Sequence, residues 1–446
     1  MTSPHHDPSA ASRRADRVPR FLRPMIPPSP IAGRLAIQSM ITRAGGGAFD
    51  TVSAVFLLRV VGIGPAQVGL AITIALVARA VAAYPVGRIV DALGPKRVWL
   101  LATVIRAVLF AAMPFIGSWL AYVAIAIAFE ASEAAGESAN LAYRLDVVPA
   151  EERITTQAYV YSAINIGFTI GALIGGVALG FSTGVVRWVP WLAAALMLAN
   201  AWWIHRLPHA PHDLRVAERS KDDGPQERPE GPSAIRNVGW FLTSALNSTM
   251  WTNQVLLTVV IPLWLVARTD APHVLLAWLF GTNTVLCIFV PPYLAKLGHT
   301  LDAALRAVAV STGFFIVSCL ITMVTHSTTG LWTIALVWLG HLTVTGAELA
   351  ITTASWSFQA ELMDPRRRGE YDGVANIARG VGSMWAPALF TWLAMDWDGI
   401  GGHAGVGWLV IAAIITCAGI GMRPSVRLAE RFAARHFPEP ATSGVE

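Results

Sequence analysis

Residues Gly87–Arg97 read GRIVDALGPKR, and this stretch decides how the rest of the chain is interpreted. It joins two long apolar runs, at about 65–87 and 98–117, through a short segment that holds two glycines, one acid and three bases. Glycine permits a tight turn and the close approach of another backbone. Charges of both signs at the edge of apolar runs need partners. The stretch therefore predicts a tight, charged hinge between two helices.

Apolar runs like these two recur along the whole chain. Of its 446 residues 54% are hydrophobic and only 14% are charged, against roughly 25% charged in soluble domains. A helix needs about 20 apolar residues to cross a bilayer. We expect twelve such spans, at about 34–58, 65–87, 98–117, 119–143, 154–181, 187–207, 237–266, 273–296, 302–325, 330–358, 370–395 and 403–421. The sequence thus predicts an all-α membrane protein with twelve transmembrane helices.

The basic residues set the expected orientation of these spans. Cytoplasmic loops of membrane proteins carry an excess of Lys and Arg. With the N-terminus inside, only Arg59, Arg187 and Arg268 fall in outer loops, and most other basic residues fall in inner ones. We therefore expect both termini to be cytoplasmic, in a multi-pass protein of a bacterial plasma (inner) membrane. The net charge of +5 then reflects topology, and no nucleic-acid partner is predicted.

A polar interval divides the spans into six and six. Residues 208–236 are rich in Pro, Gly and mixed charges, which is typical of a flexible linker. Short charged loops also precede two similar stretches, AINIG at Ala163–Gly167 and VANIA at Val374–Ala378, which suggests a duplicated unit. The expected organisation is a disordered cytoplasmic N-terminal tail 1–30, a six-helix bundle 31–207, a cytoplasmic linker 208–236, a second bundle 237–421 and a cytoplasmic C-terminal tail 422–446.

The hinge resembles the loop between the second and third helices of the major facilitator superfamily, written G-x-x-x-D-x-x-G-[RP]-[RK]-[RK]. The residues in register are Gly87, Asp91, Gly94, Lys96 and Arg97. The resemblance implies two pseudo-symmetric six-helix bundles, the major facilitator fold, with a substrate site between them. It also implies that this loop is a gate that stabilises one state of a rocking transporter.

In physical terms the gate depends on Asp91. At the end of the second helix its carboxylate can face the positive N-terminus of the eleventh helix. Lys96 and Arg97 can pair with acids at neighbouring helix ends, for example Asp146. The alternative is a loop that only sets topology, and such a loop would need no more than Lys96 and Arg97.

A second resemblance lies in the fifth helix, in the glycines Gly167, Gly171, Gly175 and Gly176. Their spacing is similar to the G-x-x-x-G-P-x-x-G-G signature of drug:proton antiporters, although Ala172 stands where that signature has proline. The resemblance implies export in exchange for protons. Small residues at this spacing also let two helices pack closely across the domain interface, which requires no antiport.

Nine ionisable residues fall inside the expected spans. Each would cost about 3 kcal/mol if it faced lipid, so we expect them to pair or to line water and to mark a functional pathway. They are Arg43, Asp50, Arg79, Arg106, Glu130, Glu133, Glu137, Glu348 and Arg379.

Three of these acids, Glu130, Glu133 and Glu137, share one face of the fourth helix. In the superfamily the first, fourth, seventh and tenth helices line the central cavity. The resemblance therefore makes Asp50, Glu130, Glu133 and Glu348 the candidates for proton coupling. The alternative is that some are structural ion pairs, Arg106 with Glu137 and Arg79 with Glu133.

Further candidates lie on the later helices. On the tenth, His341 is seven residues before Glu348 and is either a proton relay or a packing residue. On the eleventh, Arg379 can pair with Glu348, and Arg379 or Arg43 can hold an anionic substrate group. On the seventh, a polar stripe suits either a ligand or helix packing; its members are Asn247, Trp251, Gln254 and Thr258.

The sequence predicts a transporter and argues against an enzyme. It contains no nucleophile–His–acid grouping, no phosphate-binding glycine loop and no metal-ligand spacing of His or Cys. We expect no cofactor and no metal, and we expect a monomer in a lipid bilayer whose partners are protons and a small-molecule substrate. The preferred function is proton-coupled efflux of an amphipathic compound such as a drug or secondary metabolite. The alternative is proton-coupled import of a polar or anionic nutrient.

Overall fold

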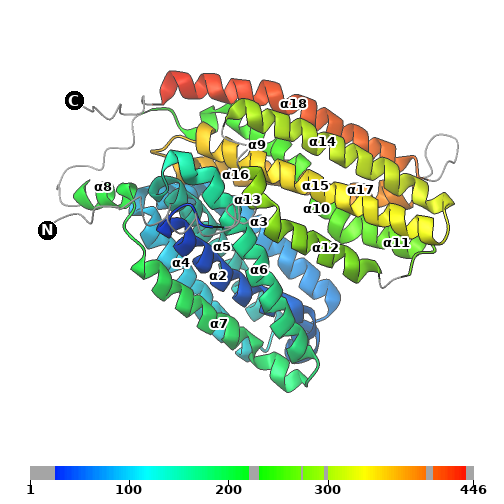
Figure 1. Cartoon of the computed structure of the whole chain (residues 1–446). Helices are drawn as coiled ribbons and strands as arrows, with labels where there is room; N and C mark the ends of the chain where they lie inside the picture. The colour runs from blue at the N-terminus through cyan, green and yellow to red at the C-terminus, as the bar shows by residue number, and fades with distance from the viewer. Residues whose placement is uncertain (1–25, 220–230, 273–274, 296–299, 398–404, 438–446) are drawn as a thin grey trace.

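The computed structural model describes residues 26–219, 231–272, 275–295, 300–397 and 405–437. Its helices form two bundles that meet at one end and diverge from it (Figure 1). The predicted N-terminal tail is described only from residue 26, and the C-terminal tail only to residue 437.

The first bundle has six long helices, and apolar composition with proline at the first turn explains where several of them begin. They are α2 (Pro30–Val55), α3 (Pro65–Leu93), α4 (Pro95–Ala112), α5 (Trp119–Val147), α6 (Arg153–Leu179) and α7 (Thr183–Arg206). Gly94 separates α3 from α4 with φ of 91°. Other residues rarely adopt this left-handed backbone, which explains the glycine.

The second bundle repeats this order with more interruptions. Its helices are α9 (Val238–Met250), α10 (Asn253–Val255), α11 (Ile261–Arg268), α12 (Leu275–Phe289), α13 (Pro291–Leu294), α14 (Leu301–Val324), α15 (Leu331–Leu362), α16 (Arg368–Ser383), α17 (Ala386–Met395) and α18 (Gly407–His436). The seventh expected span is thus divided into α9, α10 and α11, the eighth into α12 and α13, and the eleventh into α16 and α17. The first and seventh spans each contain a π-helical segment, at Phe56–Val61 and Leu256–Val260.

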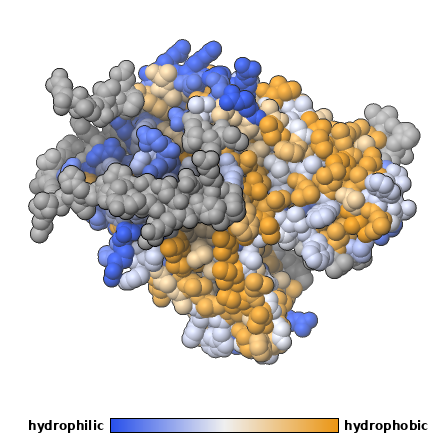
Figure 2. All heavy atoms as spheres, in the orientation of Figure 1, coloured by the Kyte–Doolittle hydropathy of each residue, from blue (hydrophilic) through white to orange (hydrophobic). Residues whose placement is uncertain are grey.

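The surfaces of these helices are apolar. Ten helical segments of the described chain are long and apolar enough to cross a membrane. Large side chains such as Val81 and Leu120 are more than 70% exposed, at 73% and 72%. Figure 2 shows apolar residues over the outer faces of both bundles and hydrophilic residues near the end of α18. Such exposure suits lipid and not water.

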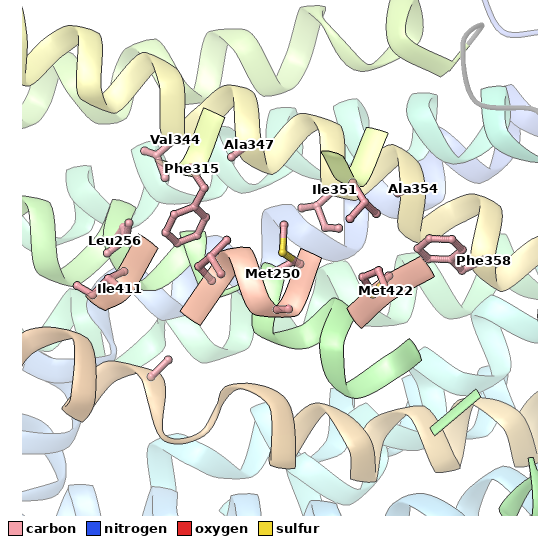
Figure 3. Packing of buried hydrophobic residues seen from close by; sticks show 14 of the residues in the cluster. Met250, Leu256, Phe315, Val344, Ala347, Ile351, Ala354, Phe358, Ile411 and Met422 are labelled. Carbon is pink, nitrogen blue, oxygen red and sulfur yellow. The ribbon is translucent and has the colours of Figure 1, made fainter. Parts of the chain in front are cut away.

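Apolar side chains also fill the interior of the second bundle. Met250 of α9, Phe315 of α14, Phe358 of α15 and Met422 of α18 belong to one buried cluster (Figure 3). In the first bundle, α2 packs along α6, and in the second, α9 packs along α16 in the same way. This equivalence supports the duplicated unit that the sequence suggests.

Two segments differ from their expected character. The stretch expected as a flexible linker contains a helix, α8 (Pro211–Arg219), which packs against α3, α4 and α5. The sequence did not predict α8 because the mixed charges of this stretch also suit a solvated linker. At the C-terminus, α18 continues through residues 422–436, which were expected to be a tail.

Candidate functional site

The hinge at Gly87–Arg97 lies where the two bundles meet. We call this end, which also holds α8 and the turn at residues 148–152, the gate end (Figure 1). The backbone of Gly87 lies against the carbonyl of Gly369 at the start of α16, and a methyl group on either glycine would overlap the other backbone. Glycine is required here because the two helices cross at backbone contact.

Asp91 caps the start of α16 from the other bundle. Its two carboxylate oxygens accept hydrogen bonds from the backbone N–H groups of Gly369 and Glu370, each at 2.8 Å. A helix N-terminus favours negative charge because its first N–H groups lack partners within the helix. The position predicted for Asp91 is therefore the one found.

Lys96 and Arg97 of the hinge do not pair with Asp146 as expected. The Nζ of Lys96 donates to the carbonyls of His205 and Leu207, at 3.1 and 2.5 Å, and not to an acid. Arg97 is exposed and makes no ion pair within the described part of the chain. The end of α7 folds back over α4, so its unpaired carbonyls reach Lys96 before any carboxylate does.

Asp146 at the end of α5 is instead contacted from two other elements. Arg368 of α16 lies 3.5 Å away and Arg215 of α8 lies 3.9 Å away. The backbone N–H of His212 donates to the same carboxylate at 2.7 Å. The helix in the linker thus takes part in the contacts at the gate end.

A further contact joins the bundles through Glu370. Its carboxylate accepts from the hydroxyl of Tyr84 on α3 and from the backbone N–H of Ala234, both at 3.0 Å, and from the hydroxyl of Ser233. In the loop before α16, burial raises the pKa of Asp364, although the Arg366 N–H donates to its carboxylate at 2.9 Å. Of the acids at the gate end, Asp91, Asp146 and Glu370 are held by donors from another element, and Asp364 by a donor from its own loop.

A cavity of about 720 Å³ lies between the bundles. Both bundles contribute to its walls, which mix charge with aromatic rings. Its charged lining consists of Arg43, Arg106, Arg144, Arg379, Glu133, Glu137 and Asp372, and its tryptophans are Trp99, Trp240, Trp251 and Trp356. A cavity of this size and chemistry suits a small polar or amphipathic organic molecule.

The buried charges of the first bundle form ion pairs, but with partners exchanged. Arg79 reaches Glu130 at 2.9 Å and Glu137 at 2.5 Å, and Arg106 reaches Glu133 at 2.5 Å. The pairs expected from sequence, Arg106 with Glu137 and Arg79 with Glu133, are therefore wrong. The tilt of α3 and α4 against α5 brings each arginine to a carboxylate one turn away from the expected one.

Glu348 lies in a different environment. It is 4% exposed, and the hydroxyl of Tyr161 on α6 donates to it at 2.5 Å from the first bundle. The side-chain amide of Asn283 donates at 3.0 Å, and the thiol of Cys287 lies at 3.7 Å. This carboxylate is thus held by neutral donors, and one of them crosses between the bundles.

Two expected neighbours of Glu348 lie elsewhere. Arg379 faces the cavity and forms no ion pair with Glu348 in the described structure. His341 is buried with its ring edge against Phe280, 6.4 Å between centroids. The expected Arg379–Glu348 pair is therefore wrong, because α15 turns Glu348 toward α6 and α12 and not toward α16.

These features agree with a comparison of the sequence with known families. The sequence model of the Major Facilitator Superfamily matches residues 35–387. The chain belongs to the Major Facilitator Superfamily. It is accordingly a multi-pass membrane transporter, and no curated protein sequence matches it.

Solved structures of this superfamily share the fold. One is the proton:xylose symporter XylE bound to 6-bromo-6-deoxy-D-glucose, with a TM-score of 0.65 and 12% identity over 89% of this chain and 95% of that one. Another is a bacterial homologue of the iron transporter ferroportin in an outward-facing state, with a TM-score of 0.63 and 11% identity over 91% and 100%. At such identity the likeness shows the fold alone.

Within this major facilitator protein the polar stripe of the seventh span is only partly at the cavity. Asn247, Trp251 and Gln254 line it, whereas Thr258 donates to the Gln254 carbonyl at 2.7 Å and lies outside the lining. The indole N–H of Trp251 donates to Ser355 at 3.1 Å. The break between α9 and α10 sets these side chains at the cavity.

The remaining coupling candidates lie just outside the cavity. Asp50 is exposed on α2 and forms no ion pair in the described structure. Glu130 is held behind the lining by Arg79. Of the four candidates, Glu133 lines the cavity and Glu348 lies at the contact between bundles.

The glycines of the fifth helix serve packing inside one bundle of this facilitator. Gly167, Gly171 and Gly175 lie against the backbone of α2, and a methyl group there would overlap it. Gly176 has no atom within 4 Å of such a methyl position. The expectation that these glycines pack across the interface between bundles is therefore wrong, since α2 and α6 belong to the same bundle.

Several residues of the site were not candidates in the sequence. Arg144 and Asp372 had the spacing of topological charges near helix ends, and Tyr161, Asn283 and Cys287 were single polar residues in apolar runs. Only the three-dimensional arrangement brings these residues to the cavity and to Glu348.

Proposed function

We propose that this chain is a proton-coupled secondary transporter that exports a small amphipathic organic compound by alternating access. We place it as a monomer in a bacterial inner membrane with both termini and the gate end in the cytoplasm. The distribution of Lys and Arg supports this orientation. In it, the state described here is closed to the cytoplasm.

The observation that carries the proposal is the hydrogen bond from Tyr161 to Glu348. It joins the two bundles at a buried carboxylate with no cation within ion-pair distance in the described structure. A charged carboxylate in such a place depends on its donors. If the bundles move apart at the gate end, Tyr161 leaves, and proton binding then removes the cost of a buried charge that has lost a donor. Proton occupancy and the arrangement of the bundles are linked in this way.

The gate contacts respond to the same movement. Opening the gate end separates Asp91 from the N–H groups of α16 and Arg368 from Asp146. Each contact is made in one state only, as a two-state switch requires. A substrate leaving the cytoplasm and a proton entering it would therefore use the same gate in alternation.

Proton flux in proteoliposomes tests the proposal. Purified protein is reconstituted with a lumenal pH dye, and amphipathic compounds are added outside under an imposed pH gradient. We expect substrate entry to drive protons out and make the lumen alkaline. Glu348→Gln should abolish this coupled flux while the protein remains folded. Glu430→Gln, at a half-buried residue near the end of α18 that pairs with Arg427, should not. Wild-type flux in Glu348→Gln would remove Glu348 from the mechanism.

A second candidate is proton-coupled import of an anionic nutrient. It is favoured by Arg43 and Arg379, which face the cavity from opposite bundles. In the same vesicles a symporter would bring protons in with its substrate, so the lumen would become acidic. The sign of the pH change thus separates export by exchange from import by symport.

A further inference from the structure

The charges that line the cavity do not cancel. Among the described residues, four arginines and three acids line it, and no lysine does. Arg106 is neutralised by Glu133, and Glu137 is engaged by Arg79 from behind the wall. The cations that remain on the cavity side are Arg43, Arg144 and Arg379.

Arg144 is the least satisfied of these three. Its Nε is buried and has no hydrogen-bond partner in the described structure. Glu137 and Asp372 act on it, but beyond ion-pair distance. Asp372 is itself bonded by the side-chain amide of Asn376 at 3.0 Å. A guanidinium in such a position is stabilised by an anion that brings oxygen acceptors to it.

The other two arginines, Arg43 and Arg379, face the cavity from opposite bundles, and their guanidinium groups can bind a ligand. Arg43 on α2 is 43% exposed and only approaches Glu137, at 4.0 Å. Arg379 on α16 is exposed in the cavity and makes no ion pair within the described residues. Arg79 is occupied by Glu130 and Glu137. The acids that face the three arginines are Glu137, Asp372 and, near Arg43, Asp50, and none of them reaches Arg144 or Arg379 within ion-pair distance in the described structure. An anion placed here would contact both bundles.

The walls beside this region are aromatic and amide-bearing. Trp251, Trp356 and Asn247 line the same cavity, and Trp356 packs edge-on against Tyr161 with 5.9 Å between centroids. Rings of this kind bind the flat apolar part of a ligand. The cavity therefore offers a cationic pole, which suits an anion, and an aromatic wall.

We propose that Arg43, Arg144 and Arg379 form a subsite for the carboxylate or phosphoryl group of an aromatic organic anion, and that such anions are the substrate class. This rests on the proposed function in one respect, namely that the cavity carries a substrate. Because Arg379 comes from one bundle and Arg43 and Arg144 from the other, the anion bridges the bundles and is released when they separate.

Binding in detergent tests the subsite without transport or a proton gradient. The probes are 2-naphthoate, 2-naphthyl phosphate and the neutral 2-naphthamide, measured by calorimetry on the purified full chain. We expect one or both anions to bind about 10-fold or more tightly than the amide, because hydrogen bonds between charged groups are the strong ones. Which anion binds better distinguishes a carboxylate from a phosphoryl substrate.

Variants locate the site. Arg379→Gln and Arg144→Gln should each lower anion affinity about 10-fold and leave amide affinity unchanged, and Arg144→Lys should restore part of the loss. Arg306→Gln, on the exposed face of α14, is the matched control and should change nothing. Arg379 makes no ion pair in the described structure, so its variant is expected to fold even if that of Arg144 does not.

Two results of the binding experiment would overturn the subsite, and one result from transport would do the same. One is anion binding no tighter than amide binding, including binding of neither. The other is an equal loss of anion and amide affinity in Arg379→Gln. Coupled transport of a neutral compound would sink the subsite and leave the proposed function intact. If the protein bound the anions but showed no proton-coupled flux, the proposed function would fail and the subsite would stand.

Discussion

The two bundles hold their buried acids in different ways. In the first bundle Glu130, Glu133 and Glu137 are paired with Arg79 and Arg106, and all five residues lie on helices of that bundle. In the second bundle Glu348 has only neutral donors, and the hydroxyl of Tyr161 comes from the other bundle. In the proposed mechanism the bundles rock against each other, which leaves the first arrangement intact and breaks the second.

The difference separates charges that stabilise from a charge that can respond. An ion pair within one bundle has the same Coulomb energy in either state of the transporter. Its proton affinity therefore does not change as the state changes. The proton affinity of a carboxylate does change when one of its hydrogen-bond donors moves away. The density of acids on α5 is therefore a poorer guide to coupling than the single acid at the contact between bundles.

The largest expected effect is on the network of the first bundle. Arg106→Met leaves Glu133 buried without its cation, and breaking a buried pair in this way costs about 3–5 kcal/mol. Thermal unfolding in detergent should show this loss. The double variant Arg106→Met/Glu133→Met removes both charges and should be much closer to wild type. If the double variant lost as much stability as Arg106→Met and Glu133→Met lose together, the two charges would not stabilise each other.

The second effect concerns the contact between Gly87 and Gly369 at the gate end. In the proposed mechanism this contact keeps Tyr161 close to Glu348. Gly87→Ala places a methyl group against the Gly369 backbone, so the gate end cannot close fully. Cys287 reports this, because it is 1% exposed beside Tyr161. With Cys319 and Cys417 replaced by serine, we expect an impermeant maleimide to label Cys287 about 10-fold faster.

The control for this variant is Gly313→Ala on α14, where a methyl group meets no atom within 4 Å. Its labelling rate should equal that of the parent. If Gly87→Ala also labels at the parent rate, the contact between α3 and α16 does not hold the bundles together, and Glu348 keeps its donor without the gate.

The third effect is on the bond between the bundles itself. Tyr161→Phe removes the donor to Glu348 and keeps the ring against Trp356. A hydrogen bond to a charged group contributes about 1.5–3 kcal/mol, so proton-coupled flux in vesicles should fall about 10-fold. Tyr143→Phe loses a similar bond, to the Pro208 carbonyl at 2.7 Å, away from Glu348. Equal losses in both variants would mean a general effect of hydroxyl removal.

The sequence was a good guide where one short segment carried the whole signal. The hinge predicted the position of Asp91 at the start of the eleventh helix because acid, glycines and helix end lie within eleven residues. The i, i+3, i+7 spacing predicted that three glutamates share a face. The shared face of the glutamates needs only local geometry, whereas the partner of Asp91, 278 residues away, was expected from the resemblance of the hinge to a known gate loop.

The sequence was a poor guide where a contact depends on helix tilt or on the second bundle. The exchange of partners between Arg79 and Arg106 reflects a shift of about one turn, 5.4 Å, which no spacing along α5 can reveal. Tyr161 and Glu348 are 187 residues apart. Arg144 lies near a helix end, so its charge could be read as topology alone.

The smallest expected effect concerns the Cys287 thiol, and it tests how much each donor contributes to holding the Glu348 carboxylate. Cys287→Ala removes a thiol at 3.7 Å, and a thiol is a weak donor. Coupled flux should therefore change by no more than about twofold, which corresponds to less than about 0.5 kcal/mol. A loss as large as that of Tyr161→Phe would show that a donor within the second bundle holds the carboxylate. Glu348 would then be as independent of the rocking movement as the acids of the first bundle, and the contrast between the two bundles would disappear.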